Sequence, residues 1–406
     1  MAAEQGSAQL APDASPQSGV SHGLIPLARP EIGDAEIAAV ARVLRSGWLT
    51  QGREVAAFEA EFANFVGAGH AIAASNGSAA LLLALRALGL EPGAEVITVS
   101  HSFIATADAV REAGAFPVFL DIEPTTGNMD PAKLEATITA RTRAILCVHQ
   151  LGMPCDLAQI LAIARRHGIP VVEDAACAAG SEVRLDTHWE RIGKPHGTIA
   201  CFSFHPRKLL TTGEGGMVTT ADAEIARKIR LLRNHGMSAS ALSRHEAPEV
   251  VFERYDTPGF NHRMTDIAAA VGRVQLARLP DIVARRRALA GRYHTLLARI
   301  PGLATPTEPG WARGNWQSYG VRLPERLDQR ATMQRLLDLG VATRRGVMCA
   351  HREAAFPTGS WRSAGTLAES ERAQDTSILV PLFAQMTVDD QDRVVAALAS
   401  VCARCP

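Results

Sequence analysis

The sequence has no excess of charge of either sign. Its 42 basic residues are matched by 42 acidic ones, so no overall field draws the protein to nucleic acid or to an anionic membrane. It also lacks an apolar run of membrane-spanning length, because Arg86 and Glu91 interrupt and end the longest candidate, near Ala79–Leu90. We therefore expect neither nucleic acid nor a membrane among the partners of this protein.

A disulfide framework is missing as well. The seven cysteines are an odd number scattered over 406 residues, a pattern typical of reduced thiols in a cytoplasmic protein. Cys402 and Cys405 form a C-x-x-C pair, but no second pair accompanies them, so we expect no metal. Residues 1–23 are rich in Ala, Ser, Gln and Pro and lack the regions of a signal peptide, which predicts a disordered tail.

The glycine motifs of nucleotide-binding folds do not occur. No G-x-G-x-x-G follows an expected strand, and no G-x-x-x-x-G-K-[ST] is present. A nicotinamide-dependent dehydrogenase and a P-loop enzyme are therefore disfavoured.

What the sequence does contain is an alternation of short apolar runs with helical periodicity, from about residue 24 to residue 279. Such alternation predicts an α/β fold, with a largely parallel sheet buried on both faces. We predict a large domain over residues 24–279, with a mostly parallel, seven-stranded sheet between helices, and a smaller α+β domain over residues 280–406. The expected strands of the sheet are Ala71–Ser75, Glu95–Val99, Phe116–Leu120, Arg143–Val148, Ile169–Glu173, Ile199–Phe204 and Met217–Thr220.

A long basic helix is expected over Asp266–Ile300, where Pro301 and Gly302 end it. It would join the two domains, and we interpret its Arg285–Arg287 run as a solvated helix face rather than a ligand patch. The other expected elements are helices over Ala79–Leu88, Phe103–Ala113, Pro131–Thr139, Leu157–His167, Gln329–Leu339 and Asp389–Val401, and a strand over Tyr319–Leu323.

A candidate phosphate site lies where a strand turns directly into a helix, around Gly77 and Ser78. Gly77 permits close backbone approach, and Ser78 suits the N-cap of the helix while it offers a hydroxyl. The free N–H groups and the positive dipole end of such a helix attract a phosphate. A plain helix cap is the alternative interpretation.

A candidate carboxylate, Asp174, follows the buried strand Ile169–Glu173. It stands at the carboxyl end of that strand, where open α/β sheets bind their ligands. The carboxylate suits a protonated ring nitrogen of a cofactor, and the alternative is a capping or loop carboxylate.

The third candidate is Lys208, which follows a strand and Ser203 and precedes the glycine-rich turn Thr211–Gly216. A lysine amine forms a Schiff base with an aldehyde once a desolvated, cationic surrounding has deprotonated it. Together with the phosphate site and Asp174, this predicts pyridoxal 5′-phosphate (PLP) held as a Schiff base on Lys208.

These segments, in this order, resemble the DegT/DnrJ/EryC1/StrS family of sugar aminotransferases, which belong to PLP fold type I of the aspartate aminotransferase superfamily. The resemblance runs from Pro26 to about Leu398. It also rests on the segments Ser46–Gly52, Ser102–Thr106, Gly259–Ile267 and Pro381–Phe383.

The resemblance implies a role for each matching residue. Gly77 and Ser78 would hold the cofactor phosphate, with a further hydrogen bond from Ser203. Asn261 would reach the cofactor phosphate of the neighbouring subunit, so the resemblance implies a homodimer with composite active sites.

The ring of the cofactor is implied to lie between Phe103, against its face, and Asp174, which would pair with its nitrogen. Lys208 would be the catalytic residue. Cys177 departs from the family pattern, which commonly has Gln or His near the phenolic oxygen of PLP. A thiol is a poorer hydrogen-bond partner, and Cys177 is equally a candidate for a small packing residue.

Three further residues, Trp48, His205 and His351, are candidates for contact with the substrate. A structural role is the alternative for the two histidines.

The resemblance implies a ping-pong transamination from an amino acid, L-glutamate, to a nucleotide-linked keto-sugar, in the synthesis of amino sugars, polysaccharides or glycoconjugates. A PLP-dependent sugar dehydratase is the first alternative, but family members of that kind have His in place of the lysine. A non-catalytic regulatory protein on the same scaffold is the second, and the intact Lys208 and Asp174 weigh against it.

Overall fold

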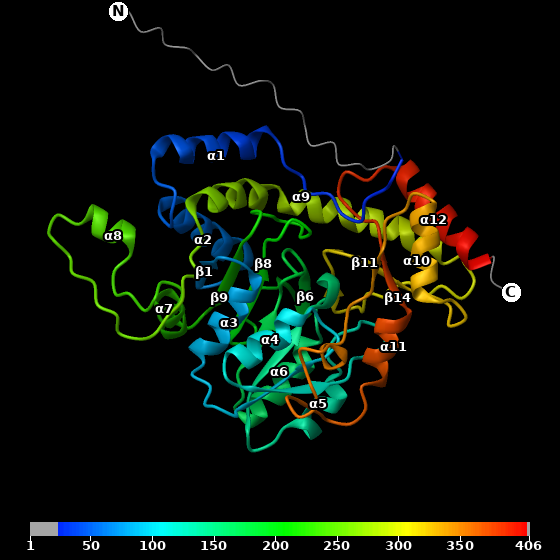
Figure 1. Ribbon diagram of the computed structural model, residues 1–406, viewed down its shortest axis with the longest axis horizontal. Coiled ribbons are helices and arrows are strands. Elements are labelled where there is room, and N and C mark those ends of the chain that lie inside the picture. Colours follow the sequence, from blue (N-terminus) through cyan, green and yellow to red (C-terminus); the bar gives the residue numbers. More distant parts are fainter. Residues whose placement is uncertain (1–22, 404–406) are drawn as a thin grey trace, which may run out of the picture.

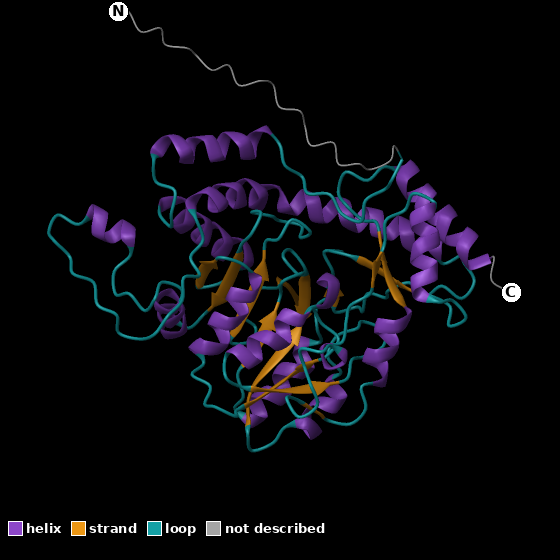
Figure 2. Ribbon diagram, viewed as in Figure 1, coloured by secondary structure: helices purple, strands orange, loops and turns teal. Residues whose placement is uncertain are grey.

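A computed structural model describes residues 23–403 of the chain (Figure 1). Apart from Gly23, the predicted tail lies outside these residues, and so does Cys405. Helices lie on both sides of a central sheet, and a smaller sheet lies beside it near the C-terminal helices (Figure 2). Within residues 23–403, no helix is long and apolar enough to cross a membrane.

The central sheet has eight strands. They are β1 His70–Ala74, β2 Glu95–Val99, β3 Phe116–Leu120, β4 Thr142–Val148, β5 Val171–Asp174, β8 Ile199–Ser203, β9 Gly216–Thr220 and β13 Arg362–Ser363. Their order is β1-β9-β8-β5-β4-β2-β3-β13. All neighbours from β8 to β13 are parallel, whereas β9 is antiparallel to both β1 and β8. The carboxyl ends of β2, β5 and β8 therefore meet at one edge of the sheet.

The seven strands predicted for this sheet are all present, and none of their ends differs from its prediction by more than two residues. The predicted number of strands was nevertheless wrong by one. The eighth, β13, comes from the C-terminal part of the chain and pairs with β3. It has only two residues, too few for an alternating pattern to reveal it.

Each face of the sheet packs against its own set of helices. One face carries α2 (Arg53–Val66), α5 (Pro131–Thr137), α6 (Leu157–His167) and α9 (Asp266–Leu297), and the other carries α3 (Gly77–Ala87), α4 (Ile104–Glu112) and α7 (Ala223–Leu232). On the first face Phe62 and Phe202 meet edge to face, with ring centroids 5.0 Å apart. Burial on both faces explains why the strands are almost continuously apolar.

The long helix α9 begins at the predicted residue and ends three residues before the predicted one. It runs along the molecule from α1 (Asp34–Ser46) toward α10 (Gln329–Asp338) and α12 (Val388–Ala403) (Figure 1). Near its C-terminal end it packs into a second apolar core with these helices and a small sheet of β11 (Tyr319–Arg322), β14 (Ser377–Val380) and β12 (Arg344–Arg345). The predicted domain boundary at residues 279 and 280 falls inside α9, and it stays a prediction.

The interpretation of the Arg285–Arg287 run as a solvated face was wrong for Arg286, whereas Arg285 is exposed. Arg286 is buried, and its guanidinium donates to the carbonyl oxygens of Trp316 and Gln317 at 2.8 and 2.7 Å. Burial lowers the pKa of Arg286 to about 9. These carbonyls belong to a loop distant in sequence, so the periodicity of the helix could not reveal the contact.

The remaining elements are mostly short. A third sheet has the order β10-β6-β7. The segment around α8 extends away from the central sheet (Figure 1). The bounds are β6 Glu182–Leu185, β7 His188–Arg191, β10 Ala312–Arg313, α8 Ala241–Glu246, α11 Ala368–Thr376 and the 3-10 turns Gln150–Gly152 and Ala350–Arg352.

Candidate active site

Lys208 lies in the loop that follows β8, at the carboxyl edge of the central sheet. Two hydrogen bonds hold this loop. The Thr211 hydroxyl and the backbone N–H of Thr212 both donate to the Phe204 carbonyl, at 2.9 Å each. The Lys208 amine reaches across to the loop after β5, where its Nζ is 3.0 Å from Cys177 Sγ. The structure therefore brings the predicted lysine and the predicted Cys177 together.

Asp174 ends β5 and is buried. Its Oδ2 accepts a hydrogen bond from Thr106 Oγ1 at 2.7 Å, and its Oδ1 accepts one from the Ala176 backbone N–H at 3.1 Å. Ser102 Oγ is in turn 2.7 Å from Thr106 Oγ1. Because the Thr106 hydroxyl donates to the carboxylate, it is free to accept from Ser102, and the two hydroxyls form a relay that fixes Asp174.

Thr106 is a candidate site residue to which sequence reasoning gave no role. It stands in the segment Ser102–Thr106, one turn after Phe103 on α4, but is 68 positions from Asp174 in sequence. Only the packing of α4 against the strand ends brings the two residues into contact.

The residue that caps the start of α3 is not the predicted one. The N-cap is Asn76, whose side chain accepts from the Ala79 backbone N–H at 2.8 Å, and not Ser78. Asn76 caps as well as Ser does, because both offer a side-chain oxygen that accepts a hydrogen bond from a backbone N–H of the first turn. Ser78 is thereby left exposed in the first helical turn, with its hydroxyl available to a ligand.

Position 77 must be a glycine because Ser203, at the end of β8, lies too close for a side chain. A Cβ added at Gly77 would lie 2.6 Å from the Ser203 Cβ, closer than packed carbon atoms approach. The lack of a side chain lets the amino end of α3 come up against Ser203. The helix start, with its free backbone N–H groups and the exposed Ser78 hydroxyl, therefore lies against Ser203, and donors of this kind fit a phosphate group.

Phe103 is the residue that precedes α4, and 62% of it is exposed. An exposed phenylalanine at the edge of the sheet is free to lie against a flat ring. Phe103 directly precedes the helix whose Thr106 contacts Asp174. The residue predicted to contact the ring face and the residue predicted to contact the ring nitrogen are therefore linked through α4.

Asn261 lies in the segment between α8 and α9, where it pairs with Asn234 in a short β-bridge. The next residue, His262, accepts from the Ser75 backbone N–H at 2.9 Å through its carbonyl. This contact ties the segment to the loop that carries Gly77. The reach of Asn261 into a neighbouring subunit stays a prediction.

The three candidate substrate contacts lie in different surroundings. Trp48 is half-buried and its ring centroid is 5.2 Å from that of His245, while His205 is exposed two positions before Arg207. His351 is different, because both of its ring nitrogens already contact protein. Nδ1 is 2.6 Å from Ser100 Oγ, and Nε2 is 3.0 Å from Glu371. These contacts favour the structural alternative for His351.

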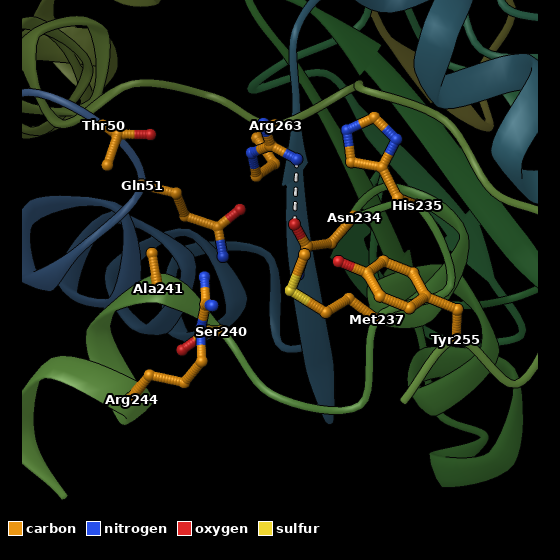
Figure 3. A pocket seen from close by; sticks show the side chains of 10 residues that line it. All are labelled: Thr50, Gln51, Asn234, His235, Met237, Ser240, Ala241, Arg244, Tyr255 and Arg263. Atoms are coloured by element: carbon orange, nitrogen blue, oxygen red, sulfur yellow. Dashed lines mark hydrogen bonds between the residues drawn. The ribbon is translucent and has the colours of Figure 1, made fainter. Parts of the chain in front are cut away.

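A cavity of about 590 Å³ opens beside the Asn261 segment (Figure 3). Gln51 and Arg244 point into it from one side, and His235 and Tyr255 lie on the other. Arg263 donates to Asn234 at its edge, at 2.9 Å. No carboxylate is among the residues that line this cavity. Sequence reasoning named only Trp48 near this cavity, because the lining residues Asn234, His235 and Arg244 lie outside the segments on which the resemblance rests.

The site combines an aspartate at a strand end, a lysine and a helix start that suits a phosphate, all at one edge of a mostly parallel sheet. This combination is typical of an enzyme of the PLP aminotransferase type. The chain belongs to the DegT/DnrJ/EryC1/StrS aminotransferase family, whose profile matches residues 30–399. It is therefore an aminotransferase, and its family is PLP-dependent. Among the described residues, no group of His, Cys, Asp and Glu is placed to hold a metal ion.

Several relatives resemble the chain over nearly its whole length. The spore coat polysaccharide biosynthesis protein SpsC of Bacillus subtilis is 39% identical over 381 residues, which cover 93% of this chain and 97% of SpsC. The aminotransferase TlmJ of Streptoalloteichus hindustanus has a TM-score of 0.85 at 34% identity, with 94% and 99% covered. The PLP form of Spr1654 from Streptococcus pneumoniae has a TM-score of 0.85 at 25% identity, with 94% and 99% covered.

Proposed function

We propose that this protein is a PLP-dependent sugar aminotransferase that carries its cofactor on Lys208 and moves an amino group from glutamate to a nucleotide-linked keto-sugar. One observation carries the proposal. Lys208, the buried Asp174 and the Gly77–Ser78 helix start lie at one edge of the sheet, where they would serve the aldehyde, the ring nitrogen and the phosphate of PLP. The name of the relative SpsC supports a sugar acceptor.

The residues of this chain fit the cofactor at both of its ends. The helix start at Gly77, with the hydroxyls of Ser78 and Ser203, supplies donors for a phosphate. Asp174 presents a carboxylate whose orientation is fixed by Thr106, and a fixed carboxylate holds a proton on a ring nitrogen. When bound there, PLP supplies an electron sink for negative charge at a substrate carbon.

Lys208 has two tasks in this proposal: it binds the cofactor, and its freed amine moves a proton between two carbon atoms of the reacting group. The amine already lies 3.0 Å from the Cys177 thiol, which holds it over the carboxyl end of β5. A lysine at this position supports transamination over the dehydration alternative, which uses a histidine there.

The cavity in Figure 3 supports a nucleotide-linked acceptor. Arg263 provides positive charge and His235 a hydrogen-bond donor, and Arg244 adds a guanidinium that lies 3.2 Å from Glu253. Such a surface suits the phosphates of a nucleotide sugar. Its place next to the Asn261 segment, which contacts the Gly77 loop through His262, connects it to the cofactor site.

A homodimer is part of the proposal. Several large apolar side chains near the cavity of Figure 3 are exposed. Phe252 is 88% exposed, and Leu49 and Tyr255 are exposed as well. Exposed apolar groups of this size mark a surface that a partner covers. A second copy of the chain, which would bring its Asn261 to the cofactor, suits this surface.

The test of the function starts from the purified protein. It should carry a chromophore that absorbs in the visible region, and borohydride should fix that chromophore to Lys208 in a peptide map. Lys208→Ala should fold normally and lose amino transfer. Glutamate should bleach the chromophore, and a panel of nucleotide keto-sugars should be screened for its return. A label on another residue, or turnover in Lys208→Ala, would contradict the proposal.

The composite site has its own test. Lys208→Ala and Asn261→Ala subunits, each inactive alone, should regain some activity after they are mixed, because one hybrid site receives both intact residues. If subunit exchange is demonstrated and activity does not return, the active site is not shared between subunits.

A further inference from the structure

The Lys208 amine and the Cys177 thiol bring two reactive groups into direct contact. The amine donates a hydrogen bond to the sulfur, with Nζ 3.0 Å from Sγ. No other side chain in the described part of the chain forms a hydrogen bond with this sulfur. Peroxides oxidise a thiolate to a sulfenic acid, and a nitrogen nucleophile beside the oxidised sulfur can attack it. The pair therefore has the chemical composition of a redox-sensitive site.

Cys177 also differs from the other cysteines in its access to solvent. It is half-buried, whereas the remaining cysteines of residues 23–403 are buried, namely Cys147, Cys155, Cys201, Cys349 and Cys402. A small oxidant in the surrounding water therefore reaches Cys177 before the others. The arrangement does not favour a disulfide as the product, because those other thiols lie inside the protein while the lysine amine already touches the sulfur.

One loop holds the backbone on both sides of the pair. Asn315 Nδ2 donates to the Cys177 carbonyl at 2.8 Å, and Gln317 Nε2 donates to the carbonyl of Arg207, the residue before Lys208, at 2.9 Å. The Gln317 backbone N–H donates to Asn315 Oδ1 at 2.9 Å, which joins the two contacts. Because the backbone is held on both sides, only the flexible lysine stem has to move to bring nitrogen and sulfur together.

We infer that a peroxide joins Cys177 to Lys208 through a covalent sulfur–nitrogen bond, and that this bond reversibly blocks attachment of the cofactor. In the first step the sulfur attacks hydrogen peroxide, the O–O bond breaks, and a sulfenic acid and a water molecule form. In the second step the unprotonated Nζ attacks the sulfur. The S–N bond forms, the S–O bond breaks, and the oxygen leaves as water with a proton from the nitrogen. The sulfur is thereby oxidised by two electrons, and the peroxide is reduced to two water molecules.

The covalent bond does not depend on the proposed function, but its consequence for the cofactor does. An amine that is joined to sulfur cannot also bind the aldehyde of PLP, so the cofactor and Cys177 compete for one nitrogen. Capture by the amine also protects the sulfur from the higher oxidation states, which are irreversible. An added thiol reverses the bond by attack on the sulfur, which returns the free thiol and the free amine and leaves a disulfide of the reagent.

The experiment treats the full-length protein with hydrogen peroxide, either loaded with PLP or after removal of the cofactor, and maps tryptic peptides by mass spectrometry without reduction. Trypsin cleaves after Arg207 but not after a modified lysine, so the two peptides of interest are 167–184 and 208–227. In cofactor-free protein they should be found joined, at a mass two hydrogen atoms below their sum. PLP-loaded protein should not form this product. Dithiothreitol should remove the link and restore binding of PLP.

Three variants distinguish the link from simple oxidation of a thiol. In Lys208→Ala, which has no amine to capture the sulfenic acid, Cys177 should proceed to the sulfinic acid at a peroxide dose that links the wild type. Cys177→Ser should keep its binding of PLP through that treatment, measured against its own untreated sample. Cys201→Ala is the matched control, since Cys201 is buried on β8, and it should form the link as the wild type does. Thermal unfolding checks that each variant folds.

The same maps contain the results that would overturn the inference. A Cys177 that stays reduced, that pairs with another cysteine, or that proceeds to the sulfinic acid in the wild type without a linked peptide would show that the lysine does not capture the sulfur. A link that dithiothreitol removes without any return of PLP binding would show that the bond does not control the cofactor. None of these results would touch the proposed function, which fails if the untreated protein transfers no amino group.

Discussion

Replacement of Thr106 by valine tests whether the aspartate at the strand end must be held by its neighbours. Valine has nearly the shape of threonine, so the change removes the hydroxyl and little else. Asp174 accepts two hydrogen bonds in the structure, from Thr106 at 2.7 Å and from Ala176 at 3.1 Å. The variant removes the shorter one and leaves the buried Ser102 hydroxyl without its partner.

The size of the effect follows from the charge and the burial of the acceptor. A hydrogen bond to a charged group contributes about 1.5–3 kcal/mol, so loss of this one should reduce the free energy of unfolding by about that amount. Part of the same energy orients Asp174 toward the cofactor ring. We expect Thr106→Val to weaken binding of pyridoxamine 5′-phosphate, which has no covalent bond to Lys208, by about tenfold or more.

The assay is equilibrium binding of pyridoxamine 5′-phosphate to the apoenzyme, with urea unfolding measured in parallel. Thr106→Ser keeps the hydroxyl and should bind within about threefold of the wild type. Equal affinity in Thr106→Val and the wild type would show that Asp174 is positioned without Thr106. Equal losses in the valine and serine variants would show that the methyl group, and not the hydrogen bond, is what matters.

Two shorter predictions concern the phosphate loop and acid stability. Gly77→Ala should weaken binding of the cofactor about tenfold or more, because its Cβ would lie 2.6 Å from that of Ser203 and would push the helix start away from β8; unchanged binding in a fluorescence titration would contradict this. Hydrogen bonding to Arg362 is the main cause that lowers the pKa of the buried Glu95 to about 2, from 4.5. The pair should therefore stabilise the fold above pH 4.5 by up to about 3 kcal/mol and lose that contribution as the pH falls toward 2, and Glu95→Gln should flatten the pH dependence of urea unfolding in that window.

The sequence predicted the parts of this protein that local patterns encode. The strands of the central sheet are apolar because they are buried on both faces, so their positions were predicted to within two residues. Lys208, Asp174 and Gly77 were predicted as site residues because each stands at the junction of a strand with a loop or helix, where ligands bind in open sheets.

The parts that sequence reasoning missed are contacts between residues far apart in the chain. Arg286 was assigned to solvent because its helix position alone is uninformative, and the carbonyl groups that bury it lie 30 positions away. The same holds for Thr106 and Asp174. The error at the α3 cap was local: Asn76 and Ser78 are both good caps, and only the geometry of the turn decides which one closes the helix.

These long-range contacts join the candidate active site to the loop that precedes β11 of the small sheet. The buried Arg286 holds the carbonyls of Trp316 and Gln317, and Gln317 in turn holds the backbone next to Lys208. On the other side of the sheet edge, His351 contacts Ser100, which precedes the loop of Phe103. The C-terminal part of the chain therefore positions the lysine and the aromatic side chain from two directions without itself supplying either. A substitution at Arg286 should thus change cofactor binding, although this residue touches neither Lys208 nor Asp174 in the structure.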